Sequence, residues 1–600
     1  MSDDSKKTKQ ENVATPRIED LFPTYANLRL GEEEVNALTV KERQELLSRL
    51  DYRRKYQLLR SADDLPELLA GLSPEDFFFT IESAGRTDAM DLVLSATPAQ
   101  LSHTLDVSCW TRNDFHPEEL LDWLGNMIQQ DPDECVARLR DLDPELLMLT
   151  LGRYVAVRRP EWTEDRSYID DNRYFSLDDQ NLLELVEPEN PRNERAMVLL
   201  QMLYRLDIEH FRYLMEALLW ELPSNLEEHA LRSRADRMIG RGYPEYLESI
   251  ALFSPADPEK LKTAILTRTW PEKRPPKGKE SLPVFYRHFL SGGSFLFRVL
   301  KELDDADQER IRTELVFLAN RILVAREALS DLEKVRESLT EAHHTLSLGL
   351  EFASEGRIER GLEILRRAPA GEVFRVGYNL TLNLHKQAKH FEESHLARHR
   401  RALSLLGTPT REVLMGLLRK PPLYYTGAEP GELRPETRLF ASHLEIERAA
   451  AWLERAVFLF DLHFRLMGLR MDQVFEGASS IGVEPLEADQ RLLKIFFTAY
   501  ANLYLEGKLQ YRPISRENFE RLLSDWLQPA GAGAYALRPD FGRDLNAWMF
   551  SMVVNEPEAY RQLASDWAVG ALRIIERLAS ELETLTHSGA IRLSRVLLLE

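Results

Sequence analysis

The sequence predicts an all-α protein, a multi-unit helical superhelix of solenoid-like architecture with at most one minor β-hairpin near residues 170–185. Three observations support this prediction. Apolar residues recur with a helical period from about Leu46 onward. Strand-type alternation is nearly absent, and its best example is the short stretch Arg173–Leu177. Helix starts marked by proline recur through the first quarter of the chain.

These helix starts share one arrangement, in which a capping residue is followed by proline. The pairs are Ser73-Pro74, Thr97-Pro98, His116-Pro117, Asp131-Pro132 and Asp143-Pro144. A Ser, Thr or Asp side chain at the N-cap accepts a hydrogen bond from the first turn, and proline at N1 lacks only a donor that the helix does not use. His116 fills the cap less well. The irregular spacing of the prolines favours a degenerate solenoid, with an irregular helical bundle as the alternative.

Changes in composition divide the chain into further segments. The stretch Pro271–Lys279 is rich in proline and positive charge, and a second group of Pro and Gly residues begins at Pro421. We therefore expect a disordered tail over 1–20, helical repeats over 21–153, a helical unit with an acidic loop over 154–270, a basic Pro-rich linker over 271–283, a helical unit over 284–420, a Pro/Gly linker over 421–436 and a C-terminal helical bundle over 437–600.

Composition and charge restrict the class of function. The hydrophobic share of 44% and the charged share of 29% are those of a globular protein. The formal net charge of -21 repels phosphate backbones, so we expect no nucleic-acid partner.

Cys109 and Cys135 are the two cysteines, and we expect reduced structural thiols. Residues 1–17 lack the apolar core of a signal peptide, and the chain lacks an apolar membrane-spanning stretch. These features predict a cytoplasmic protein without an integral membrane segment.

Two passages resemble known families. The proline-started helices from Leu65 to Leu151 resemble the N-terminal helical domain of MgtE-type magnesium transporters, which is a superhelix of short helices. The second passage is a set of motifs: Leu218–Ser224, Gly242–Tyr246, Phe253–Pro258, Leu348–Glu351 and Phe374–Tyr378. These motifs resemble an uncharacterised bacterial family, a domain of unknown function found in long, cytosolic, all-helical proteins. The chain has nothing similar to the CBS pair or the channel of the transporters, so the resemblance implies neither transport nor a set of magnesium ligands.

Histidines form the candidate metal site. His395 and His399 are four residues apart, a spacing that places two imidazoles on one helical face, and His385 lies upstream. A divalent metal is the one cofactor that this pattern suggests. However, the sequence contains no HExxH motif, and the neighbouring Lys and Arg residues favour a solvated helix face.

Two further stretches suggest ligand chemistry less strongly. The Gly-rich segment Pro529–Ala534 lacks the preceding strand and the GK[ST] of a phosphate-binding loop, so we expect a flexible connector. The acidic stretch that holds Glu164, Asp165, Asp170 and Asp171 lacks the spacing of a calcium loop, which favours a solvated loop. The sequence contains no GxSxG motif of serine hydrolases. No catalytic residue is predicted.

The segment from Trp220 to Pro258 is the candidate binding surface. Its polar and aromatic residues gather around two turns; the ones that we single out are Trp220, Glu221, Glu228, Arg232, Arg237 and Tyr243. The alternative is a helix corner held by i, i+4 ion pairs such as Glu228–Arg232. Ser224, followed three residues later by Glu227, fits a capping box at the start of the intervening helix.

The sequence thus favours a non-enzymatic protein–protein interaction or scaffold protein that uses a helical surface, with an unidentified protein partner and an oligomeric state that the sequence does not specify. The alternative is a regulator that senses a ligand or a divalent metal, or an enzyme with its site between helical units.

Overall fold

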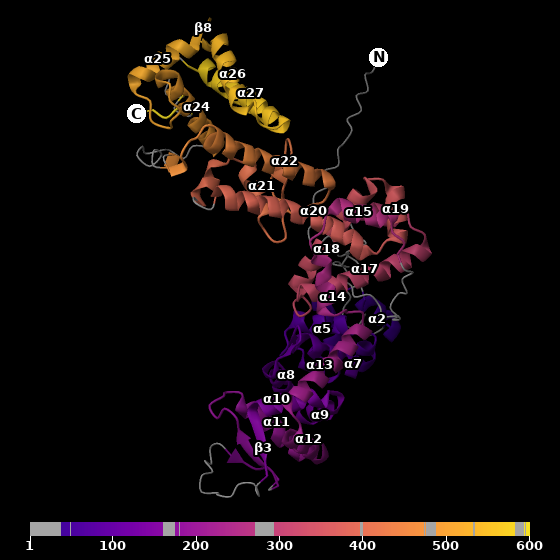
Figure 1. Cartoon of the computed structure of the whole chain (residues 1–600). Coiled ribbons are helices and arrows are strands. Elements are labelled where there is room, and N and C mark those ends of the chain that lie inside the picture. Colours follow the sequence, from indigo (N-terminus) through magenta and orange to yellow (C-terminus); the bar gives the residue numbers. More distant parts are fainter. Residues whose placement is uncertain are drawn as a thin grey trace. The chain divides into compact units, whose positions relative to one another are not determined.

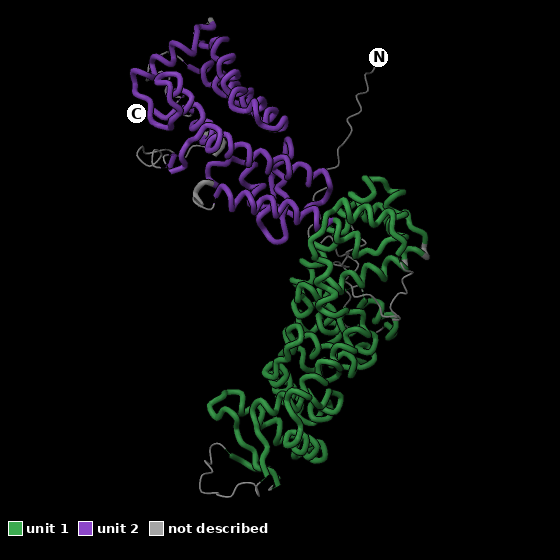
Figure 2. Tube along the Cα trace, in the orientation of Figure 1, with its two compact units in different colours: residues 1–376 green, residues 377–600 purple. Residues whose placement is uncertain are grey.

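Helices begin at all five proline-marked positions. The computed structural model describes residues 38–48, 50–159, 174–178, 180–270, 293–396, 400–472, 474–475, 488–531, 534–582, 593 and 596–599. The predicted disordered tail, the basic linker and the acidic stretch lie outside these described residues. The chain divides into two compact units, residues 1–376 and residues 377–600 (Figure 2).

Unit 1 is built from helices, most of them of one to four turns (Figure 1). The first nine are α2 (Val40–Leu47), α3 (Tyr52–Arg60), α4 (Leu65–Ala70), α5 (Pro74–Ala84), α6 (Met90–Leu94), α7 (Pro98–Ser108), α8 (Pro117–Gln130), α9 (Pro132–Arg138) and α10 (Pro144–Tyr154). The next are α11 (Asn193–Leu206), α12 (Ile208–Trp220), α13 (Pro223–Gly240), α14 (Tyr246–Ile250), α15 (Pro258–Thr267), α16 (Phe295–Lys301), α17 (Asp305–Ala325), α18 (Leu332–Ser354) and α19 (Ile358–Arg367). Helix α20 (Ala370–Phe391) contains the boundary between the units.

Three of the four expected side-chain caps form at the proline-marked starts. Ser73 accepts from the backbone N–H of Asp76 at 3.1 Å, and Asp131 accepts from Glu134 at 3.0 Å. Thr97 forms a full capping box at the start of α7. Asp143 makes no cap bond, because its carboxylate is bound by an arginine of α13, described below. The local sequence therefore predicts the helix starts, and a tertiary ion pair overrides one cap.

A continuous apolar core joins the helices from α2 to α13. The first turns of α5 show why these short helices need one another, since Phe77 and Phe78 are fully buried and Phe79 nearly so. Each fully buried Phe stabilises the fold by about 1.5–3 kcal/mol relative to an exposed one. Helix α5 packs against α3 and α7, and α10 packs against α13. The solenoid arrangement itself stays a prediction.

Short strands interrupt the helices. Strands β3 (Val155–Arg158), β5 (Leu182–Leu185) and β4 (Tyr174–Phe175) form an antiparallel sheet in the order β3-β5-β4, at the place where the sequence allowed one hairpin. The described residues also hold three two-stranded ribbons that the sequence analysis did not foresee. They are β1 (Trp110–Thr111) with β2 (Asp114–Phe115), β6 (Tyr424–Tyr425) with β7 (Thr437–Arg438), and β8 (Leu527–Gly531) with β9 (Ala534–Leu537). The all-α class is confirmed, with these ribbons as minor additions.

Unit 2 contains fewer and longer helices. After the second half of α20 come α21 (Thr410–Leu417), α22 (His443–Phe460), α24 (Ala488–Glu506), α25 (Arg516–Trp526), α26 (Pro539–Val553) and α27 (Glu558–Ser580). Helix α24 is central, as its apolar circumference predicts: Phe496 and Phe497 are fully buried, and Phe496 contacts the rings of Trp548 and Trp567. No helix in the described parts of either unit is long and apolar enough to cross a membrane.

Candidate functional site

The predicted binding surface separates into an outer and an inner part. Helix α12 ends at Trp220, and α13 begins three residues later at Pro223. Leu222 takes the N-cap of α13, and Ser224 makes no cap bond, so the predicted capping box is wrong. The cause is that Pro223 fits N1 and thereby places Ser224 inside the first turn. We call residues 213–228 the α12–α13 corner.

The outer part of the predicted surface lies on this corner. Trp220 is 64% exposed, and its indole Nε1 donates to the Glu216 carboxylate at 2.9 Å. Glu221 is exposed. Glu228 and Arg232 form an exposed ion pair of 2.9 Å one turn apart, as the alternative interpretation expected.

The corner also exposes two large apolar side chains that the sequence analysis did not single out. Leu222 is 62% exposed and Tyr213 is 53% exposed. Tyr213 precedes Trp220 by seven residues, so both side chains lie on one face of α12. The seven-residue spacing is visible in the sequence, but a buried helix shows the same spacing on the face that it turns to the core. Only the fold shows that this face of α12 is exposed.

Arg237 belongs to the inner part and forms a clamp between α13 and two of the proline-started helices. Its Nε and Nη2 donate to the two carboxylate oxygens of Asp106 in α7, at 2.8 and 2.7 Å. Its Nη1 donates to Asp143 in front of α10 at 2.7 Å. Asp106 is only 1% exposed, and burial raises the pKa of its carboxyl while the bonds from Arg237 oppose that rise. Burial acts to lower the pKa of Arg237, but its bonds to both carboxylates outweigh this and raise it.

Two further arginines, Arg234 in α13 and Arg241 at its C-cap, bind main-chain carbonyls of α7 and of the β1–β2 turn. Arg234 donates to the carbonyls of Asp106 and Arg112, both at 2.9 Å, and its guanidinium lies over the ring of Trp110. Arg241 donates to the carbonyl of Ala99 at 2.8 Å. The Asp106 carbonyl is in the last turn of α7, where a cation is favourable. Arg234, Arg237 and Arg241 therefore hold α13 against α7. Arg232, the other arginine that suggested a surface, stays exposed.

Tyr243 and His103 continue this inner polar layer. The Tyr243 ring stacks on the His103 imidazole at 6.2 Å, and its hydroxyl lies 3.5 Å from the Glu75 carboxylate. His103 is 2% exposed. Burial, with a smaller contribution from the positive charges of Arg241 and Arg234, holds the pKa of His103 well below its usual value. His103 is therefore neutral, and the layer acts as a polar part of the core.

Two of the three candidate metal ligands lie in the described part of the chain, and each has other partners there. His385 is buried, and its Nδ1–H donates to the carbonyl of Leu417 at 2.9 Å. His395 lies in a π-helical turn, Glu392–Leu396, and stacks on Phe391. His399 lies outside the described residues, so the His395–His399 pair stays a prediction. Among the described residues there is no group of three or more His, Cys, Asp or Glu side chains arranged to hold a metal.

His395 instead joins a hydrogen-bonded chain between two π-helical turns of unit 2. Its Nε2 lies 3.3 Å from Asp461, the first residue of the second turn, Asp461–Leu466. Asp461 also accepts from Tyr560 at 3.0 Å and pairs with Arg465, which in turn binds Glu556. Burial, supported by the bond to Asp461, raises the pKa of Tyr560 to about 12. The chain ties the start of α27 to the ends of α20 and α22.

Ser394 extends the same chain, since its Oγ lies 2.7 Å from His395 Nδ1. The order Ser394, His395, Asp461 is that of a nucleophilic relay. However, the Ser394 hydroxyl also donates to the carbonyl of His390 at 2.7 Å, as helix-interior serines do. A serine inside a helical turn has neighbouring backbone N–H groups engaged in the helix, so they are not free to stabilise an oxyanion. The arrangement is therefore structural.

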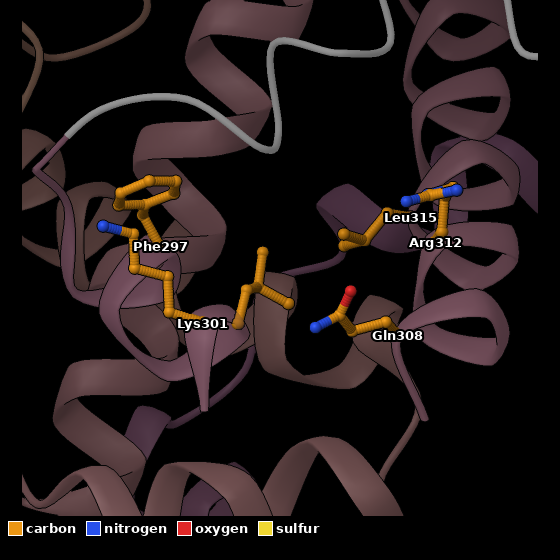
Figure 3. A pocket seen from close by; sticks show the side chains of 6 residues that line it. Phe297, Lys301, Gln308, Arg312 and Leu315 are labelled. Atoms are coloured by element: carbon orange, nitrogen blue, oxygen red, sulfur yellow. The ribbon is translucent and has the colours of Figure 1, made fainter. Parts of the chain in front are cut away.

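A cavity of about 210 Å³ lies between α16 and α17. Figure 3 shows Phe297 and Lys301 on one side and Gln308, Arg312 and Leu315 on the other. The Lys301 ammonium lies 4.6 Å from the centre of the Phe297 ring, and Gln308 donates to the carbonyl of Leu303. The volume is below the roughly 300–1,000 Å³ of small-molecule pockets. The cavity volume is closer to the volume of one large side chain.

The remaining candidates also have structural explanations. Cys109 and Cys135 are buried free thiols, and burial raises the pKa of each to about 12. The Gly-rich segment is not a connector, because residues 527–531 and 534–537 pair as the β8–β9 hairpin, with β9 packed on α27. Tertiary packing there overrides the weak strand propensity of Ala and Gly.

The fold and the site thus define an all-α protein of two units, in which the predicted site residues Arg237, Tyr243 and His385 serve the core and an apolar corner around Trp220 remains exposed. A model of a family of unknown function (DUF6178) matches residues 32–600, so the chain belongs to this family. This agrees with the expected resemblance to a family of unknown function. No curated protein and no solved structure matches the chain.

Proposed function

We propose that this chain is a non-enzymatic protein–protein interaction or scaffold protein, and that the α12–α13 corner is its docking surface. The observation that carries the proposal is the exposure of Tyr213, Trp220 and Leu222 on one short stretch of unit 1. Aromatic side chains of this kind are enriched among the residues that dominate protein interfaces.

The contacts of the inner residues support the same proposal. Arg237 and Tyr243 are occupied in the core, whereas Trp220 and Glu221 face solvent. The bond from Trp220 to Glu216 holds the indole along α12, which lowers the entropic cost of ordering it on binding. The corner thus presents a pre-arranged apolar surface on a helical scaffold.

The finer expectations belong to this proposal as well. We place the protein in the bacterial cytoplasm, with a protein partner, without a nucleic-acid partner and without a required cofactor. The likeness of the proline-started helices to the MgtE N domain fits a helical module that works through contacts with other proteins.

Affinity purification from native cells tests the proposal. The bait is the full chain, either wild type or carrying Trp220→Ser and Leu222→Ser, two substitutions at exposed positions. The matched control carries Phe550→Ser and Val554→Ser, which change exposed apolar residues of unit 2. We expect one stoichiometric partner with the wild type and the control, and its loss with the corner variant. A partner retained by all three baits would refute the assignment of the surface.

A further inference from the structure

We infer that the partner segment of the α12–α13 corner is a basic amphipathic helix of another protein. This inference rests on the proposed function and adds the chemistry of the occupant. It is drawn from the charge of the corner, the length of its apolar face and the occupants that this charge disfavours.

The corner is acidic. Between residues 213 and 228 the chain contains four glutamates, Glu216, Glu221, Glu227 and Glu228, and no lysine or arginine. Two of them are neutralised by arginines from outside the stretch, since Glu216 pairs with Arg159 and Glu228 with Arg232. Glu221, which precedes Leu222 in the chain, and Glu227, the fifth residue of α13, are both exposed. An apolar surface with acidic residues at its edge complements a segment whose apolar face is flanked by Lys or Arg.

The apolar face has the length of two helical turns. Tyr213 and Trp220 are seven residues apart on α12, about 10 Å along the axis at 1.5 Å per residue. A helical partner presents apolar anchors at i, i+3 or i+4, and i+7, which span the same length. Leu222, the N-cap of α13, adds an exposed apolar side chain two residues past the end of α12. Two turns of an amphipathic helix therefore match the surface.

Other occupants are disfavoured by the same charges. In a symmetric dimer through this surface, Glu221 and Glu227 would face the glutamates of a second copy, which is repulsive. Anionic lipid and nucleic acid are repelled by the corner and by the net charge of -21. A basic protein segment is favoured by both.

Fluorescence anisotropy with labelled peptides tests the inference on the full chain. The first probe is a helical peptide of about 14 leucine and lysine residues with one apolar face, and the second replaces every lysine with glutamate. The charge variant is Glu221→Lys with Glu227→Lys. The control is Glu517→Lys with Glu576→Lys, which makes the same charge change at exposed positions of unit 2. The apolar variant is Trp220→Ser with Leu222→Ser.

We expect the Leu/Lys peptide to bind the wild type and the Leu/Glu peptide not to bind. The charge variant should weaken binding at least about 5-fold and the control less than about 2-fold, because only the corner charges are close to the peptide. An equal loss in both would mean non-specific attraction and would overturn the inference.

The outcomes separate this inference from the function on which it rests. If the apolar variant loses the peptide and the charge variant keeps it, the acidic contribution is wrong while the docking surface stands. If both variants bind as the wild type does, both proposals fall. Circular dichroism checks that each variant is folded, and Glu221→Gln with Glu227→Gln gives a milder second test of the charge contribution.

Discussion

Replacing Arg237 with methionine should destabilise unit 1 far more than its partial exposure suggests. The substitution removes three hydrogen bonds, two to Asp106 and one to Asp143. It leaves the Asp106 carboxylate buried, at 1% exposure, without its counter-charge. Breaking one partner of a buried ion pair costs about 3–5 kcal/mol. Asp143 is more accessible and can regain water, so Asp106 accounts for most of that cost.

The pH dependence of this loss gives a second signature. Burial already raises the pKa of Asp106. Replacing Arg237 removes the hydrogen bonds and the positive charge that oppose this rise most strongly, so the pKa rises further. A carboxyl whose pKa is raised by folding contributes stability below its unfolded pKa and loses it as pH rises through the folded value. The deficit of Arg237→Met relative to wild type should therefore shrink as the pH is lowered toward 4.

Urea unfolding followed by circular dichroism measures the loss, and hydrogen exchange of α7 and α13 peptides assigns it to unit 1. Arg232→Met is the matched control, because it breaks an exposed pair on the same helix and should cost about 0.5 kcal/mol or less. The double variant with Asp106→Asn should recover much of the stability. If Arg237→Met costs no more than Arg232→Met, the clamp does not stabilise α13 against α7.

Three other predictions concern unit 1. His103 stays neutral when folded and takes up a proton when unfolded, so stability should fall as pH drops below 6.5, and His103→Gln should flatten that slope in urea titrations. Thr97→Ala should cost about 1 kcal/mol in the same assay, because the α7 capping box is lost. Cys109 and Cys135, each with a pKa raised to about 12, should resist a thiol reagent at pH 8 and react in urea; rapid labelling of the native chain would contradict their burial.

The sequence predicted what local chemistry determines. Prolines at N1 located the helix starts, and Ser73, Thr97 and Asp131 formed the caps that their side chains allow. Asp143 and Ser224 did not, because one is taken by a distant arginine and the other is shifted into the helix by the preceding proline. Capping rules consider only the residues at one end of a helix and take no account of side chains that approach from elsewhere in the fold.

The candidate surface shows the same limit. Arg237 and Arg232 look alike in the sequence, five residues apart on one helix. Their roles differ because Asp106 of α7, 131 residues away along the chain, lies within hydrogen-bond distance of Arg237. Arg232 instead pairs with Glu228 in solvent. The β8–β9 hairpin was missed for a related reason, since packing on α27 rather than strand propensity orders it.

Site-specific photo-crosslinking tests the central claim most directly. A benzoylphenylalanine replaces Leu222 in the full chain expressed in native cells, and a second version carries it at exposed Val569 of unit 2 as the control. We predict that position 222 crosslinks to one protein, through a peptide with a net positive charge and apolar residues at helical spacing, and that position 569 does not. Equal crosslinking from both positions, or an acidic crosslinked peptide at 222, would contradict the account.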